Sequence, residues 1–204
     1  MERKIRNPII ILTFPRSGSS LVTNIFYQHG FEIGKSTLKA NQNNPDGYFE
    51  NQKVKTFLAN TTGGVRSIYN NGTETISKEF KKNFMEILKD ENLSNTDWVL
   101  KLNSGYYDLL KQVFPNAVFV CTRRKKQSSF DSLDQTNFNY PKELWEWNND
   151  LIHRAALEKN ATTINYENLI IGDYREIKWA LKEAGTKPNE EILNNVIKPA
   201  YKHH

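Results

Sequence analysis

The stretch TFPRSGSSL at residues 13–21 has the residue types of an anion-binding loop. It follows the apolar run IIIL at 9–12, which is typical of a strand buried on both faces of a parallel sheet. The residues after it place their apolar positions on one face of a helix. A tight loop between a strand and a helix directs backbone N–H groups and the positive end of the helix dipole toward one point. Arg16 adds a guanidinium cation there, and the serines add hydroxyl groups.

A second cationic stretch, RRKK at 123–126, directly follows the apolar run AVFVCT at 117–122. This run predicts another buried strand, and α/β folds bind ligands at the carboxyl ends of their strands. Four consecutive cations at such a strand end indicate a second anion site rather than a solvated helix face.

The first loop departs from the nucleotide-binding pattern GxxxxGK[ST], because Thr13 replaces the first glycine and no lysine follows Gly18. TFPRSGSSL instead resembles the 5′-phosphosulfate-binding loop of the sulfotransferases that use PAPS (3′-phosphoadenosine 5′-phosphosulfate). The resemblance implies PAPS as the sulfuryl donor, PAP as the product, and no metal. It also implies that the loop binds the cofactor through Arg16, Ser17, Gly18, Ser19 and Ser20.

The resemblance extends to the second cationic stretch. The family places an arginine at the end of such a strand, eight residues before a serine that binds the 3′-phosphate, and Arg124 and Ser132 have this spacing. Arg123 would instead be paired with Asp131, whose carboxylate would repel a phosphate. We therefore prefer Arg124, with Ser128 as an alternative to Ser132.

Two catalytic residues follow from the resemblance. Arg16 stands at the position of the family's catalytic lysine or arginine, where it reaches the bridging oxygen on which charge grows as the bond to sulfur breaks. The stretch WVLKLN at 98–103 is similar to the family's central lysine-bearing strand, which adds Lys101. By analogy with phosphoryl transfer, positioning and electrostatic stabilisation supply most of the catalysis.

The acceptor also needs a general base. Many animal members of the family carry a histidine two residues after the strand lysine, but Asn103 stands at that place here. Glu50, in the turn DGYFEN, is the first choice by analogy with members that use a glutamate. His29 and Asp46 are the alternatives.

Two further segments resemble parts of the family that touch the cofactor. INYENLI at 164–170 is similar to its YEDL segment, which makes Tyr166 a candidate contact with the adenine. The basic C-terminal segment at 197–202 is similar to a tail that closes over the cofactor in some members, which adds Lys198.

The alternation of apolar runs and amphipathic segments predicts an α/β protein with a P-loop-like three-layer fold. We expect a central parallel sheet of about four to five strands flanked by helices, within a single domain at 1–204. Residues 34–75 should form an irregular insertion that covers the site, with one short helix at 51–58 and a second irregular passage at 60–72. Other helices are expected at 19–29, 76–90, 106–113, from 126, and at 142–159, 174–184 and 189–197, and other strands at 98–102 and 162–165.

The composition of the chain limits the classes of partner and the cellular compartments that we expect. The chain has 204 residues, a formal charge of +5 that suits an anionic partner, and one cysteine, Cys121, which fits a reducing compartment. We expect a cytoplasmic protein without a membrane span that acts on a hydroxyl or amine of a carbohydrate or small alcohol, and not on nucleic acid. The alternatives are a P-loop-like nucleotide kinase or hydrolase, which would need a Mg²⁺-binding carboxylate at a strand end, and a non-catalytic polyanion-binding protein.

Overall fold

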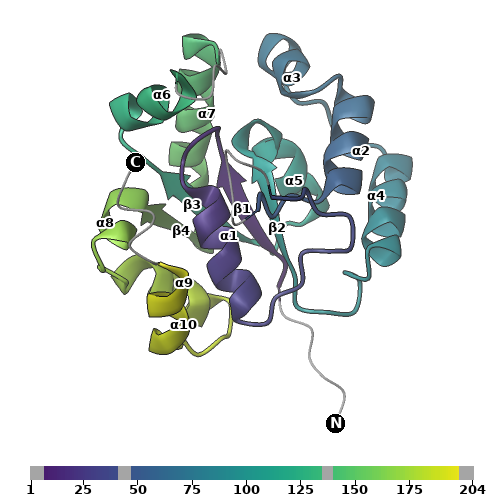
Figure 1. The fold of residues 1–204 in the computed structure, drawn as a ribbon. Helices are drawn as coiled ribbons and strands as arrows, with labels where there is room; N and C mark the ends of the chain where they lie inside the picture. The colour runs from purple at the N-terminus through teal and green to yellow at the C-terminus, as the bar shows by residue number, and fades with distance from the viewer. Residues whose placement is uncertain (1–6, 41–46, 135–139, 198–204) are drawn as a thin grey trace.

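The fold is a parallel sheet between two layers of helices (Figure 1). The computed structural model describes residues 7–40, 47–134 and 140–197. In this part of the chain the sheet has four strands in the order β2-β1-β3-β4, all pairs parallel, which confirms the predicted α/β class. The strands are β1 (Ile9–Thr13), β2 (Val99–Asn103), β3 (Val118–Arg123) and β4 (Ala161–Asn165).

The helices divide between the two faces of the sheet, as the two clusters of buried apolar side chains show. One face is covered by α1 (Ser19–Gln28), α8 (Tyr166–Ile170), α9 (Arg175–Glu183) and α10 (Glu190–Val196). The other is covered by α2 (Gln52–Thr62), α3 (Val65–Asn71), α4 (Lys78–Asp90), the short η1 (Ser104–Tyr106), α5 (Tyr107–Val113) and α7 (Lys142–Ala155). The helix α6 (Lys126–Asp134) follows β3. None of the helices described is long and apolar enough to cross a membrane.

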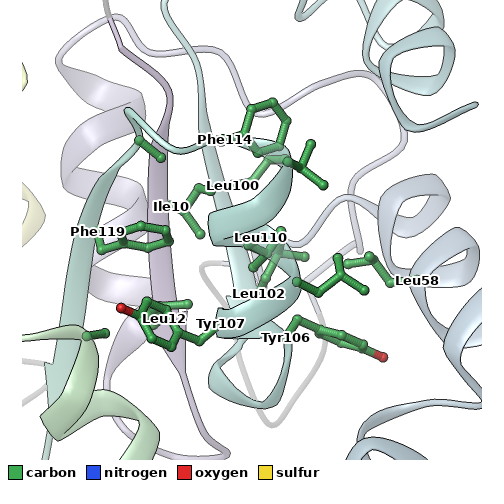
Figure 2. Packing of buried hydrophobic residues seen from close by; sticks show 14 of the residues in the cluster. Ile10, Leu12, Leu58, Leu100, Leu102, Tyr106, Tyr107, Leu110, Phe114 and Phe119 are labelled. Atoms are coloured by element: carbon green, nitrogen blue, oxygen red, sulfur yellow. The ribbon is translucent and has the colours of Figure 1, made fainter. Parts of the chain in front are cut away.

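The apolar run in β1 explains why this strand lies at the centre. Ile9 and Ile11 face the α1 side, whereas Ile10 and Leu12 face the α5 side, and all four are fully buried. Figure 2 shows Ile10 and Leu12 beside apolar side chains of β2, β3 and α5. Burial of such a side chain contributes about 2 kcal/mol, so only a strand covered on both faces gains from all four.

The segment at 34–75 is more helical than the sequence suggests. The predicted helix at 51–58 is confirmed but extends to the end of α2, with the Asn51 side chain accepting the N–H of Val54 as its cap. The prediction of an irregular passage at 60–72 is wrong, because α3 forms there. Gly63, at φ 70°, separates the two helices instead of preventing the second, and Ile68 anchors α3 in the core.

Glu91, at the end of α4, is a buried carboxylate that holds the start of this segment. It accepts hydrogen bonds from the backbone N–H groups of Lys35 (2.8 Å) and Ser36 (2.7 Å) and from Nδ2 of Asn51 (2.8 Å). Burial by itself would raise the pKa of Glu91, but the hydrogen bonds from Ser36 and Asn51 and the nearby Lys53 lower it to about 2. The ionised form is therefore the one that the fold stabilises.

We predict that stability depends on pH through Glu91. Its pKa of about 2 in the folded protein lies below the 4.5 of a glutamate in the unfolded chain, so its contribution is complete well above pH 4.5 and is lost as the pH falls toward 2. The free energy of unfolding, measured by urea denaturation, should fall by about 3 kcal/mol over this window from Glu91 alone. Glu91→Gln should flatten the fall, whereas Glu86→Gln, an exposed position on the same helix, should leave it unchanged. An equally steep fall in Glu91→Gln would contradict the assignment.

Candidate active site

The loop between β1 and α1 has the backbone of an anion site. Arg16 (φ 64°) and Gly18 (φ 83°) both adopt left-handed conformations, which turn the chain sharply before α1 begins at Ser19. Such reversals make concave groups of backbone N–H donors, and the first N–H groups of a helix have no partner within the helix. The loop lies at the carboxyl end of β1, between α6 and α3 in the view of Figure 1.

A network of hydroxyl groups fixes the shape of this loop. Oγ1 of Thr13 lies 2.7 Å from Oγ of Ser17 and donates to Oγ of Ser19 at 2.7 Å. Oγ of Ser17 also lies 2.9 Å from Oγ1 of Thr122, at the end of β3. The hydroxyl groups of Ser17 and Ser19 are thus engaged inside the protein and are not the free hydroxyl groups that we expected. The backbone N–H of Ser17 is also used, since it donates to the carbonyl oxygen of Phe14.

Arg16 joins Arg124 and Ser132, the two residues singled out by their spacing in the sequence. Nε of Arg16 donates to Oγ of Ser132 at 2.7 Å, and Nη1 of Arg124 donates to the carbonyl oxygen of Arg16 at 3.1 Å. Nε of Arg124 is buried and has no hydrogen-bond partner among the described residues. Burial lowers the pKa of Arg16, and the charge of Arg124 lowers it further. Two adjacent cations with an unused donor favour the binding of an anion.

The ring of Tyr166 closes one side of this cluster. It is buried at the start of α8 and packs against Gly18, where a Cβ atom would lie 2.8 Å from Cγ of the ring. The guanidinium of Arg124 lies over the same ring, 4.8 Å from its centroid. Tyr166 therefore connects the loop to the end of β3, and Gly18 is required both for its positive φ and for this contact.

Lys101 and Glu50 also meet at the loop. Nζ of Lys101 donates to Oγ of Ser20 at 2.9 Å and lies 2.9 Å from Oε1 of Glu50, and Lys55 of α2 binds the other oxygen of Glu50. Burial would raise the pKa of Glu50, but Lys101 and Lys55 outweigh it and hold the pKa below its usual range. Burial lowers the pKa of Lys101, and the charge of Glu50 opposes this effect.

Other candidates lie elsewhere. His29 is at the opposite end of α1, about 15 Å from the loop by the helical rise, where its ring contacts the carbonyl of Ile25 and the N–H of Asn189. His29 is therefore not a candidate base. Asp46 and Lys198 fall outside the described residues.

Two neighbours of the site have roles of their own. Arg123 contacts the ring of His153 on α7 rather than the loop, which agrees with the choice of Arg124. Asn103 accepts the N–H of Gly105 at 2.8 Å and caps the turn after β2.

Sequence reasoning missed Lys55 and Thr122. Lys55 lies five residues after Glu50, on the next helix, and nothing in that spacing indicates that both join Lys101. For Thr122, the sequence pattern predicts only a position in a buried strand. Its position beside Leu12, whose carbonyl it contacts at 3.2 Å, follows only from the pairing of β3 with β1.

Comparisons with known proteins identify the family and support the fold. The model of the sulfotransferase family matches residues 8–178, and the chain belongs to this family. The fold is similar to that of the sulfotransferase domain from the olefin synthase of Synechococcus PCC 7002 (TM-score 0.53, 16% identity, covering 100% of this chain and 85% of that one). It is also similar to the sulfotransferase domain from the curacin biosynthetic pathway (TM-score 0.54, 16% identity, 96% and 79% covered). No curated protein matches the sequence.

We predict that Gly18→Ala destabilises the protein far more than Gly30→Ala. Both glycines have a positive φ, 83° and 87°, which an alanine tolerates at a cost of about 1–2 kcal/mol. Only at Gly18 does the new methyl group also meet Tyr166, since nothing lies within 4 Å of a Cβ at Gly30. Thermal unfolding should show a loss of about 1 kcal/mol for Gly30→Ala and about 3 kcal/mol for Gly18→Ala. Equal losses would mean that Tyr166 does not pack on the loop.

Proposed function

We propose that this chain transfers a sulfuryl group from PAPS to a hydroxyl or amine of an acceptor such as a carbohydrate or a small alcohol. The observation that carries the proposal is the convergence of Arg16, Arg124 and Ser132 beside the first turn of α1. Arg16 and Arg124 follow the ends of β1 and β3, and Ser132 lies on α6. The family uses these two regions for the two phosphates of the donor.

The residues present fit a doubly phosphorylated nucleotide. The loop offers N–H groups and the positive end of α1 for a 5′-phosphate. Arg124 has an unused buried Nε, and Ser132 is buried and held by Nε of Arg16, whose carbonyl oxygen Arg124 contacts; this arrangement suits a 3′-phosphate. An anion at this point would also relieve the repulsion between Arg16 and Arg124, which lowers the pKa of Arg16 in the structure. Tyr166 packs against both Gly18 and Arg124, so it lies next to both groups and stays our candidate contact with the adenine.

When bound, PAPS would supply an activated sulfuryl group, and the protein's contribution is to place charge around it. Arg16 supplies a delocalised guanidinium cation, which is not deprotonated in proteins, and its side chain starts from the loop itself. Lys101 brings a second cation to the first turn of α1 through Ser20. Preorganised cations in a partly buried site stabilise developing negative charge more strongly than water does.

We assign to Glu50 the role of the general base that takes the proton of the acceptor. Its carboxylate lies next to Lys101, on the same side of the loop as Ser20, and its lowered pKa keeps it ionised near neutral pH. An ionised carboxylate can hold the hydroxyl of an acceptor and take its proton as the bond to sulfur forms. A lowered pKa makes Glu50 a weak base, so we expect its proton transfer to come late in the reaction.

We predict that the protein binds PAP in preference to ADP, which carries its second phosphate on the 5′-phosphate instead of at the 3′ position. Isothermal titration calorimetry of the full chain should show metal-independent binding of PAP that Arg124→Ala weakens by about 10- to 100-fold, the usual effect of removing a charged hydrogen-bond partner. The binding of ADP should change much less in the same variant, because ADP does not reach Arg124.

The matched control is Lys125→Ala. Lys125 is the next residue and has the same charge, but it is exposed, and its contact is from its backbone N–H to Glu167. This variant should bind PAP like the wild type. Tight Mg²⁺-dependent binding of ATP without any preference for a 3′-phosphate would contradict the proposal and favour the kinase or hydrolase.

A further inference from the structure

Lys55 takes part in the cluster at the loop although it lies on α2, away from the strand ends. Its ammonium group binds Oε2 of Glu50, while Lys101 lies 2.9 Å from Oε1 of the same carboxylate. Lys101 in turn donates to Ser20 in the first turn of α1. The contacts therefore run from α2 through Glu50 to β2 and then to the loop.

The charges of this cluster are unequal. One carboxylate lies between two ammonium groups, so the cluster has one positive charge in excess. The side chain of Lys101 is 3% exposed and that of Glu50 19%, whereas that of Lys55 is 43% exposed. Lys101 alone would balance Glu50, and a second cation next to a buried lysine is unfavourable by itself. The repulsion from Lys55 does act on Lys101, whose pKa is lowered first by burial and also by Lys55.

The second cation, Lys55, does affect the orientation of the Glu50 carboxylate. A carboxylate bound at both oxygens has little freedom to rotate, and its two oxygens then point in defined directions. If Lys55 were absent, Glu50 could turn about its side chain and still keep one contact with Lys101. The ammonium group of Lys101 would then be less tightly directed at Ser20.

We propose that Lys55 is a positioning residue of the transfer site, which orients Glu50 from α2 and through it directs Lys101 at Ser20. This inference rests on the proposed function only in the roles given to Glu50 and Lys101. Among the described residues, the charged groups that act on Glu50 are Lys55 from α2 and Lys101 from β2, and α1 contributes the uncharged Ser20.

The chain offers a matched control on the same helix. Lys53 lies two residues before Lys55 and is similarly exposed, at 54%, but its ammonium group pairs with Glu91 instead of Glu50. Lys53→Met and Lys55→Met therefore remove the same charge from α2, and only the second removes a contact with Glu50.

The test is a ¹³C NMR titration of the full chain labelled in the glutamate carboxyl carbons, with the Glu50 signal assigned by its loss in Glu50→Gln. In Lys55→Met we expect the midpoint of Glu50 to move to higher pH, because one of its two cations is gone. Lys53→Met should leave the midpoint in place, and Lys55→Arg, which keeps the charge, should restore it nearly to that of the wild type. The affinity for PAP should change less than twofold in Lys55→Met, since Lys55 does not contact Arg124 or Ser132.

An unchanged Glu50 midpoint in Lys55→Met, or an equal shift in Lys53→Met, would overturn the inference. So would a large loss of PAP affinity in Lys55→Met, because Lys55 would then bind the nucleotide instead of positioning Glu50. If the wild type fails to bind PAP, the proposed function fails, while the titration of Glu50 still decides whether Lys55 is paired with it.

Discussion

The pairing of β1 with a parallel strand on each side is the constraint on which the site depends. Thr13 is in register with Asn103 of β2, and Leu12 is in register with Cys121 of β3, so all three strands end at the same edge of the sheet. Residues in or after the ends of these strands then come within hydrogen-bonding distance of the β1–α1 loop and the first turn of α1. Lys101 contacts Ser20 and Arg124 contacts Arg16, although more than 80 positions of sequence separate the members of each pair. The burial of β1 on both faces holds this register, because a slip by one residue would exchange its two sets of side chains.

Cations gather at that edge at an energetic cost. Arg16 and Arg124 repel each other, and Lys101 is almost fully buried, so the protein without an anion holds unfavourable charge there. The hydroxyl network of Thr13, Ser17 and Thr122 offsets part of this by keeping the loop in one conformation. A loop that is held in place before the ligand arrives loses little conformational entropy on binding.

The 34–75 segment shows how a helical region joins a site built on strand ends. The buried carboxylate of Glu91 holds Ser36 and Asn51, and Asn51 begins α2 directly after Glu50. The position of Glu50 next to Lys101 thus depends on a contact with α4, on the far side of α2.

The sequence by itself determined the strands and most helices, because these features depend on local patterns: apolar runs and helical periodicity. A fixed spacing between a strand end and the next helix also pointed to Arg124 and Ser132, and in the structure Ser132 accepts a hydrogen bond from Arg16. The sequence also placed Glu50 and Lys101 in the site through their resemblance to family segments. The tertiary structure alone decided that Ser17 faces inward, that His29 lies at the far end of α1, and that Lys55 shares Glu50 with Lys101. Each of these depends on which distant elements pack together, and a contact between elements leaves no regular spacing in the chain.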